Sequence, residues 1–141
     1  MTERKAASDR YQRGLARMTE LVSPEHPDTF DPAKLAESYR DLDDHLADYI
    51  VSFAFGDIYT RDALTKHERT LVTISTLVAL GIERQLKVHL HVGFNVGLTQ
   101  DQLVGALIHC IPYIGFPRVL NGLNLLQQVI AERNGEEPRA S

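Results

Sequence analysis

Residues 65–117 read TKHERTLVTISTLVALGIERQLKVHLHVGFNVGLTQDQLVGALIHCIPYIGFP, and the rest of the chain is arranged around this stretch. It opens on Thr65 with Glu68 three residues later, the spacing at which a hydroxyl and a carboxylate cap the first turn of a helix. Gly81 suits the residue just past the end of that helix, because glycine tolerates a positive φ. Since residues 71–80 are apolar almost all round, we expect a buried central helix.

A helical hairpin is predicted after the central helix. Its first helix runs from about residue 84 to 96 and ends at Gly97. Its second helix runs from about residue 100 to 112, and Thr99 with Gln102 repeats the capping pattern at its start.

The segments outside this stretch also favour helices. Residues 2–22 form a mostly polar helix whose thin apolar stripe needs a surface to dock on. Three prolines make residues 23–32 a loop, and residues 55–64 are expected to form an ordered loop. Apolar residues at three- and four-residue spacing predict a helix over residues 33–53. The apolar face of that helix comprises Leu35, Tyr39, Leu42, Leu46, Tyr49, Ile50 and Phe53.

Pro117 fits the first turn of a last helix, and no segment predicts a strand. The expected fold is all-α, a compact helical bundle with a helical hairpin at its centre. A length of 141 residues suits one domain. We divide the chain into an N-terminal helical arm, residues 1–22, and a domain over residues 23–141.

Composition excludes several classes of function. A net charge of -4 leaves no basic stripe to neutralise phosphates, so a nucleic-acid partner is not expected. The longest apolar run, residues 77–82, is too short to span a membrane, and the charged N-terminus lacks a signal peptide. We therefore expect no membrane association and a cytoplasmic location. The single cysteine, Cys110, excludes an internal disulfide and a CxxC redox or zinc motif.

Three histidines lie in the hairpin. At about 100° per residue, His89 falls on the apolar face of its helix, where a core histidine bonded to a backbone carbonyl is the ordinary explanation. His91 points elsewhere, and there an exposed or interface histidine is expected. An antiparallel hairpin would place His89 and His109 at axial heights of about 12 and 15 Å from the turn, so the two could share one layer of the bundle.

Two arginines and a tyrosine are further candidates. Arg61 and Arg69 flank the start of the central helix. Each is either an ordinary surface charge or a binding group for a carboxylate, because the planar guanidinium presents its N–H donors in a rigid fork. Tyr113 ends the second helix of the hairpin, where its phenol could reach a cavity or simply pack. Cys110 falls on the apolar side of the same helix, which favours core packing.

Four motifs carry a resemblance to a known family. They are GDIYTR at 56–61, RTLVTISTLVALG at 69–81, HLHVGFNVGLT at 89–99 and YIGFPRVLN at 113–121. With these motifs, residues 30 to 132 resemble the carboxymuconolactone decarboxylase family, in the branch of 4-carboxymuconolactone decarboxylase. The resemblance implies the alkylhydroperoxidase D-like fold and a homotrimer or homohexamer with pockets near subunit interfaces.

The resemblance also implies a chemistry for the candidate residues. That branch removes the carboxylate of a γ-lactone in the β-ketoadipate route of aromatic breakdown, without a metal or organic cofactor. His89 matches the family histidine and is our choice for proton transfer. Arg61 or Arg69 would hold the substrate carboxylate, and His109 would be a second polar contact. Tyr113 and His91, the latter at a position where relatives tend to have arginine, complete the expected set around a small carboxylate or lactone.

Alternative functions remain within the same resemblance. One is a related lyase, isomerase or cyclase acting on a larger polycyclic or lactone substrate in specialised metabolism, and another is a non-catalytic oligomeric binding protein. The peroxidase branch of the superfamily uses a CxxC pair and a nearby carboxylate. Its two cysteine positions fall here at Ile82 and Gln85 and its acid position at Thr70, so peroxidase activity is not expected.

Overall fold

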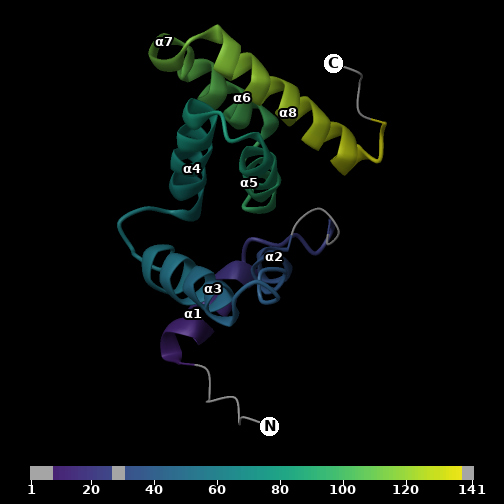
Figure 1. Cartoon of the computed structure of the whole chain (residues 1–141). Helices are drawn as coiled ribbons and strands as arrows, with labels where there is room; N and C mark the ends of the chain where they lie inside the picture. The colour runs from purple at the N-terminus through teal and green to yellow at the C-terminus, as the bar shows by residue number, and fades with distance from the viewer. Residues whose placement is uncertain (1–7, 27–30, 138–141) are drawn as a thin grey trace. The chain divides into compact units, whose positions relative to one another are not determined.

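The computed structural model describes residues 8–26 and 31–137, and within these ranges it contains helices and no strand. The all-α prediction is therefore confirmed. In chain order (Figure 1) the elements are α1 (Asp9–Thr19), α2 (Pro32–Glu37), α3 (Asp44–Tyr49), the π-helix η1 (Ile50–Ile58), α4 (Lys66–Leu80), α5 (Glu83–Asn95), α6 (Gln100–His109), α7 (Ile111–Ile114) and α8 (Phe116–Asn134). None of the described helices has both the length and the apolar character that crossing a membrane requires.

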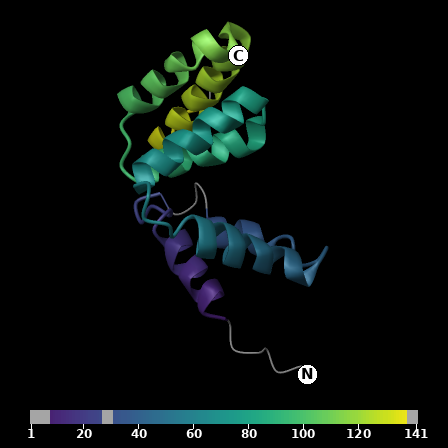
Figure 2. The ribbon, with the colours of Figure 1, turned by 90° about the vertical axis from the view of Figure 1, so that its left-hand side faces the viewer.

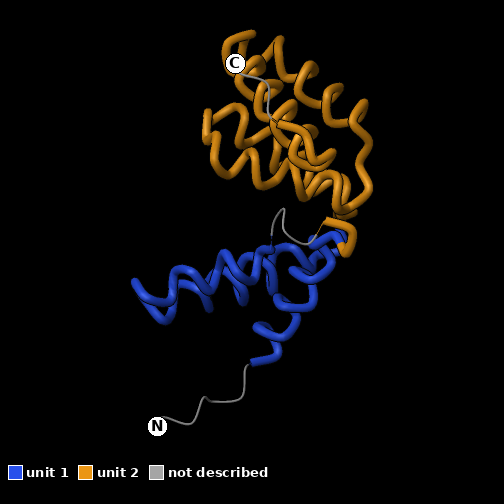
Figure 3. Tube along the Cα trace, turned by 90° about the vertical axis from the view of Figure 1, so that its right-hand side faces the viewer, with its two compact units in different colours: residues 1–23, 31–63 blue, residues 24–30, 64–141 orange. Residues whose placement is uncertain are grey.

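The chain divides into two compact units (Figure 3). Unit 1 comprises residues 1–23 and 31–63, and unit 2 comprises residues 24–30 and 64–141. The predicted boundary after residue 22 separated the N-terminal helix from everything that follows. The structure instead groups α1 with α2, α3 and η1, while residues 1–7 of the predicted arm lie outside the described residues.

Unit 2 is built on α4, α5, α6 and α8, which pack against one another (Figure 2). Their apolar faces meet in one core whose buried residues are Ile74, Val78, Leu86, Leu90, Leu98, Leu103, Leu107, Val119, Leu126 and Val129. Both capping boxes are present, at Thr65 with Glu68 and at Thr99 with Gln102. Gly81 adopts a φ of 69° just after α4, as its position in the sequence predicts.

The central helix α4 is less buried than the sequence predicts, since Val72 and Leu80 are exposed. It also carries a row of hydroxyl residues between its apolar positions. Each hydroxyl donates a hydrogen bond to the carbonyl four residues earlier, so these polar groups are satisfied inside the helix itself. The four donors are Thr70, Thr73, Ser75 and Thr76.

Unit 1 differs from the sequence-based expectation in two places. The single helix predicted over residues 33–53 is broken between α2 and α3, because the carboxylate of Asp43 caps the N-terminus of α3 and restarts the helix. Leu42 in this break is 80% exposed, so its predicted place on the buried face is wrong. Residues 50–58 form a π-helix, which occupies the first part of the predicted loop over 55–64.

The helices α1 and η1 pack backbone to backbone. A Cβ atom at Gly14 would overlap the carbonyl oxygen of Val51, and one at Gly56 would overlap the carbonyl oxygen of Arg10. The side chain of Arg10 then crosses the junction to Asp57, with Nε 3.0 Å from both carboxylate oxygens. Glycine at positions 14 and 56 is therefore what allows these two helices to meet.

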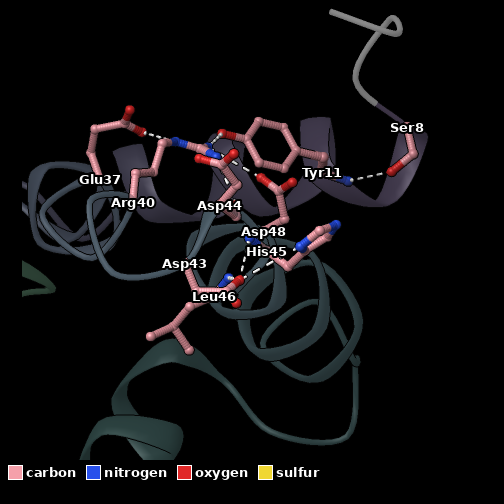
Figure 4. A network of polar contacts seen from close by, with 9 residues as sticks. All are labelled: Ser8, Tyr11, Glu37, Arg40, Asp43, Asp44, His45, Leu46 and Asp48. Atoms are coloured by element: carbon pink, nitrogen blue, oxygen red, sulfur yellow. Dashed lines mark hydrogen bonds and ion pairs between the residues drawn. The ribbon is translucent and has the colours of Figure 1, made fainter.

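Arg40 joins the helices of unit 1 from one side (Figure 4). Its Nε donates to Glu37 at 2.7 Å, and its Nη2 donates to Asp48 and to the Tyr11 hydroxyl at 3.1 and 3.2 Å. Its Nη1 donates to the backbone carbonyl of Asp44. One largely buried guanidinium thus contacts α1, α2 and α3 at once. The pKa of Arg40 is raised above its usual value, and the hydrogen bond to Glu37 is the largest cause.

Gly56→Ala is expected to lower the free energy of unfolding by about 1–3 kcal/mol, because the new methyl group must push α1 away from η1. The control is Gly105→Ala in α6, where a Cβ atom meets nothing within 4 Å. That variant is expected to gain about 0.5–1 kcal/mol, because alanine favours a helix interior over glycine. Urea unfolding followed by circular dichroism measures both, and equal midpoints for the two variants would contradict the close packing of α1 on η1.

Candidate active site

His89 lies in the middle of α5 and is partly buried. Burial lowers the pKa of its imidazole from 6.5 to about 4. Loss of solvent around the ring is the cause of this shift, and in the described part of the chain no hydrogen bond compensates for it. The expected bond to a backbone carbonyl is not found there. At neutral pH, His89 is therefore an uncharged imidazole that is costly to protonate.

His91 lies two residues further along α5 in different surroundings. It is 3% exposed, so the expectation of an exposed or interface histidine is wrong. Its Nε2 is 2.9 Å from Oε2 of Glu132 in α8. Because an ionised carboxylate can only accept, Nε2 carries the proton of the neutral ring and Nδ1 is an acceptor. This Nδ1 is buried and has no hydrogen-bond partner among the described residues.

Glu132 connects His91 to a cation. Lys87, one turn before His91 on α5, donates from Nζ to Oε1 of Glu132 at 2.5 Å. Partial burial acts to raise the pKa of Glu132, but the hydrogen bonds from Lys87 and His91 outweigh it and lower that pKa. For His91 the balance is opposite: burial lowers its pKa more than Glu132 raises it. The pair is thus a neutral imidazole on a carboxylate whose charge Lys87 offsets.

Sequence analysis did not find Lys87 or Glu132 as site residues. The four-residue spacing of Lys87 and His91 was visible and places both on one face of α5. Glu132 is 41 residues beyond His91, and only the packing of α8 against α5 brings the two together. Nothing local in the sequence indicates that contact.

A groove of about 490 Å³ opens beside this pair, between α5 and α8. Its lining residues are Glu83, Arg84, Lys87, Val88, His91, Leu125 and Glu132.

His109 and Tyr113 form a separate group at the end of α6 and in α7. Their ring centroids are 5.8 Å apart at an interplanar angle of 52°. Both side chains are exposed, Tyr113 by 76%. The structure therefore brings these two predicted residues together, on the surface of unit 2.

The two candidate arginines lie in different units. Arg61 is exposed in unit 1, three residues after η1 ends. Arg69 is partly buried in the first turn of α4 in unit 2.

His67 lies in the same turn of α4. Its ring nitrogen Nε2 is 2.5 Å from the carbonyl oxygen of Val96, and this contact connects the start of α4 to the end of α5.

The described side chains show how potential metal ligands and the single thiol are placed. Across residues 8–26 and 31–137, no three His, Cys, Asp or Glu side chains are grouped as metal ligands. Cys110 is partly buried and packs against the core of unit 2, as its position on the apolar side predicts.

Comparison with known proteins gives consistent matches. The sequence model of the carboxymuconolactone decarboxylase family matches residues 44–128. The 4-carboxymuconolactone decarboxylase of Acinetobacter baylyi is 33% identical over 123 residues, which cover 87% of this chain and 88% of that protein. The nitrosuccinic acid decarboxylase npaB of Metarhizium robertsii is 25% identical over 81 residues, 57% of each chain. All six predicted site residues fall inside the matched range, whereas Glu132 lies beyond it.

The low pKa of His89 predicts an acid-dependent loss of stability. The unfolded chain takes up a proton at this ring near pH 6.5, whereas the folded chain takes it up only near pH 4. The free energy of unfolding should therefore fall as the pH drops from about 6.5 to 4, by up to roughly 3 kcal/mol from this residue. His89→Gln should flatten that slope, as measured by urea unfolding at several pH values.

The matched control is His45→Gln, since His45 is exposed in unit 1. It should keep the slope of the unchanged chain. If His89→Gln and His45→Gln gave the same dependence on pH, burial would not be what lowers the pKa of His89.

Proposed function

The chain belongs to the carboxymuconolactone decarboxylase family and is a carboxy-lyase, and from this premise we propose that it decarboxylates a small carboxylated γ-lactone. The product would be an enol-lactone, as in the conversion of 4-carboxymuconolactone to 3-oxoadipate enol-lactone. The observation that carries this proposal is the 33% identity to a 4-carboxymuconolactone decarboxylase over nearly the full length of both chains. The reaction would need no metal or organic cofactor.

The chemistry sets two demands on the site. As the bond to the leaving carboxylate breaks, its electron pair moves through the conjugated double bond to the carbonyl oxygen of the lactone. A hydrogen-bond donor or a cation must stabilise the resulting dienolate. An acid must then return a proton to carbon, and CO₂ leaves with no change in oxidation state of the protein.

We assign the proton transfer to His89. Its depressed pKa keeps the imidazole neutral at pH 7, so its N–H can face a developing oxyanion without a permanent charge. When the ring does take up a proton, the same burial makes it a stronger acid than an exposed histidine. Such a group suits the return of a proton to carbon.

A cation must hold the substrate carboxylate until it leaves. Arg69 at the start of α4 and Arg61 in unit 1 are the two candidates from the sequence. The interaction between this cation and the carboxylate must be of moderate strength, because a strong ion pair would stabilise the substrate more than the transition state. His109 and Tyr113, exposed side by side, would supply further polar contacts.

A second candidate substrate is a small carboxylic acid that is not a lactone. The similarity to a nitrosuccinic acid decarboxylase favours it, although that match covers 57% of the chain. The two candidates share the loss of CO₂ and differ in what accepts the electrons. Parallel assays with the lactone and with nitrosuccinate separate them.

We also propose that the protein is a homotrimer or homohexamer. In unit 1, α3 and η1 carry an exposed apolar row, Leu46, Tyr49 and Phe53, with Leu42 just before it. Unit 2 exposes Ile108, Tyr113, Phe116 and Leu120. Large apolar side chains that are exposed in groups of this kind support an interaction with other subunits.

His89→Ala is expected to reduce turnover of freshly generated 4-carboxymuconolactone by at least about 100-fold, the usual contribution of a proton-transfer group. The unchanged chain should reach kcat/KM of about 10⁴ M⁻¹s⁻¹ or more. CO₂ release and enol-lactone formation are followed together, with EDTA present. His45→Ala serves as the control and should keep full activity.

Two results would contradict the proposal separately. No turnover by the unchanged chain would remove the lactone as substrate, and turnover of nitrosuccinate would then favour the second candidate. Full activity of a correctly folded His89→Ala variant would remove His89 from the proton transfer.

Tyr49→Ser combined with Phe53→Ser is expected to lower the mass measured by light scattering after size-exclusion chromatography. These side chains are 64% and 58% exposed, so the exchange should leave the interior of unit 1 intact. Circular dichroism checks that the helices persist. An unchanged mass would show that this apolar row is not an interface between subunits.

A further inference from the structure

The groove between α5 and α8 lies away from His89. Residues two positions apart on a helix point about 200° away from each other, so His89 and His91 face opposite sides of α5. His91 lines the groove, together with Arg84 and Val88 on the same face of α5. The groove is therefore a second candidate site, which the proton-transfer role of His89 does not use.

One end of the groove is electrically balanced. Glu132 accepts from Lys87 with one carboxylate oxygen and from His91 with the other. Lys87 keeps two further N–H donors, because an ammonium group has three. This end can therefore form hydrogen bonds to a ligand while adding little net charge.

The other end carries a cation. Arg84 is exposed in the first turn of α5, and within the described residues its guanidinium has no ion pair or hydrogen bond. Glu83 also lines the groove, but adjacent residues on a helix do not face each other. The carboxylate of Glu83 lies instead one turn before Lys87 and is favoured by the N-terminus of α5. Arg84 thus offers a rigid fork of donors that suits a carboxylate.

The middle of the groove is apolar. Val88 from α5 and Leu125 from α8 line it. Arg84 and His91 are seven residues apart, a rise of about 10 Å along the helix. The volume of about 490 Å³ lies within the range of pockets that hold small molecules.

We propose that this groove binds a small organic acid, with its carboxylate on Arg84 and its apolar body between Val88 and Leu125. The far end of the acid meets the polar pair of Lys87 and Glu132. The acid is a separate carboxylate that binds beside the reaction site, because His89, to which the proton transfer is assigned, faces the other side of α5.

The test is an NMR titration of the full chain with 3-phenylpropionate, which joins one carboxylate to an apolar body of suitable length. Saturable shifts are expected in the amide signals of α5 and α8 and in the ring signals of His91. The neutral analogue 3-phenylpropionamide should bind at least about tenfold more weakly, because the charged hydrogen bonds to Arg84 are lost.

Arg84→Gln should weaken binding of 3-phenylpropionate by at least about tenfold. Arg13→Gln removes the same charge from unit 1 and should leave the affinity unchanged. No saturable shift, or equal affinity in the chain with and without Arg84→Gln, would overturn the proposal. The measurement involves no turnover, so a failure of the lactone assay does not affect it.

A kinetic arm tests whether this acid is separate from the substrate. If 3-phenylpropionate raises KM for the lactone without changing kcat, and Arg84→Gln abolishes that effect, the groove holds the carboxylate of the substrate, which contradicts a separate acid. If binding is saturable while KM stays constant, the groove holds a separate acid.

Discussion

The packing of α5 between α4 and α8 is the constraint on which both buried histidine environments depend. The helices around α5 also fit closely at two glycines: a Cβ at Gly93 of α5 would come within 2.9 Å of a Leu103 methyl group in α6, and one at Gly122 of α8 equally close to Val78 in α4. Because neighbours cover α5 on two sides, side chains two residues apart along it are both removed from water. The two rings then differ in their partners, since Glu132 of α8 reaches only His91.

Burial acts on His89 and His91 in the same direction, yet their surroundings make them chemically different. Both pKa values are lowered because a charged imidazole loses its solvation. His91 recovers part of that loss through Glu132, which also fixes the proton on Nε2 and holds the ring against α8. The ring of His89 has no such compensation among the described residues. Glu132 thereby holds the ring of His91 in place, while His89 has no comparable anchor among the described residues.

Local signals in the sequence predicted local structure well. The capping boxes at Thr65 and Thr99 and the positive φ of Gly81 depend on residues within one turn, and the structure has all three. The break before α3 was missed because the apolar spacing continues through Leu42, whereas the Asp43 cap restarts the helix. The burial of His91 was missed for another reason. A helical wheel shows which residues share a face, but it does not show that α8 and Glu132 cover that face from 41 residues away.

The same fold is implied for thiol peroxidases and for decarboxylases, so the residues on α4 and α5 must decide between the two chemistries. The thiol positions hold Ile82, the residue before α5, and Gln85 in its first turn. The hydroxyl of Thr70, at the acid position, donates a hydrogen bond to the Lys66 carbonyl. The only cysteine of the chain packs against the core. The helix α5 carries instead the imidazole of His89, which is neutral and poorly solvated. A group of that kind cannot pass electrons to a peroxide, but it can donate a hydrogen bond and move a proton, as the proposed loss of CO₂ from a conjugated lactone requires.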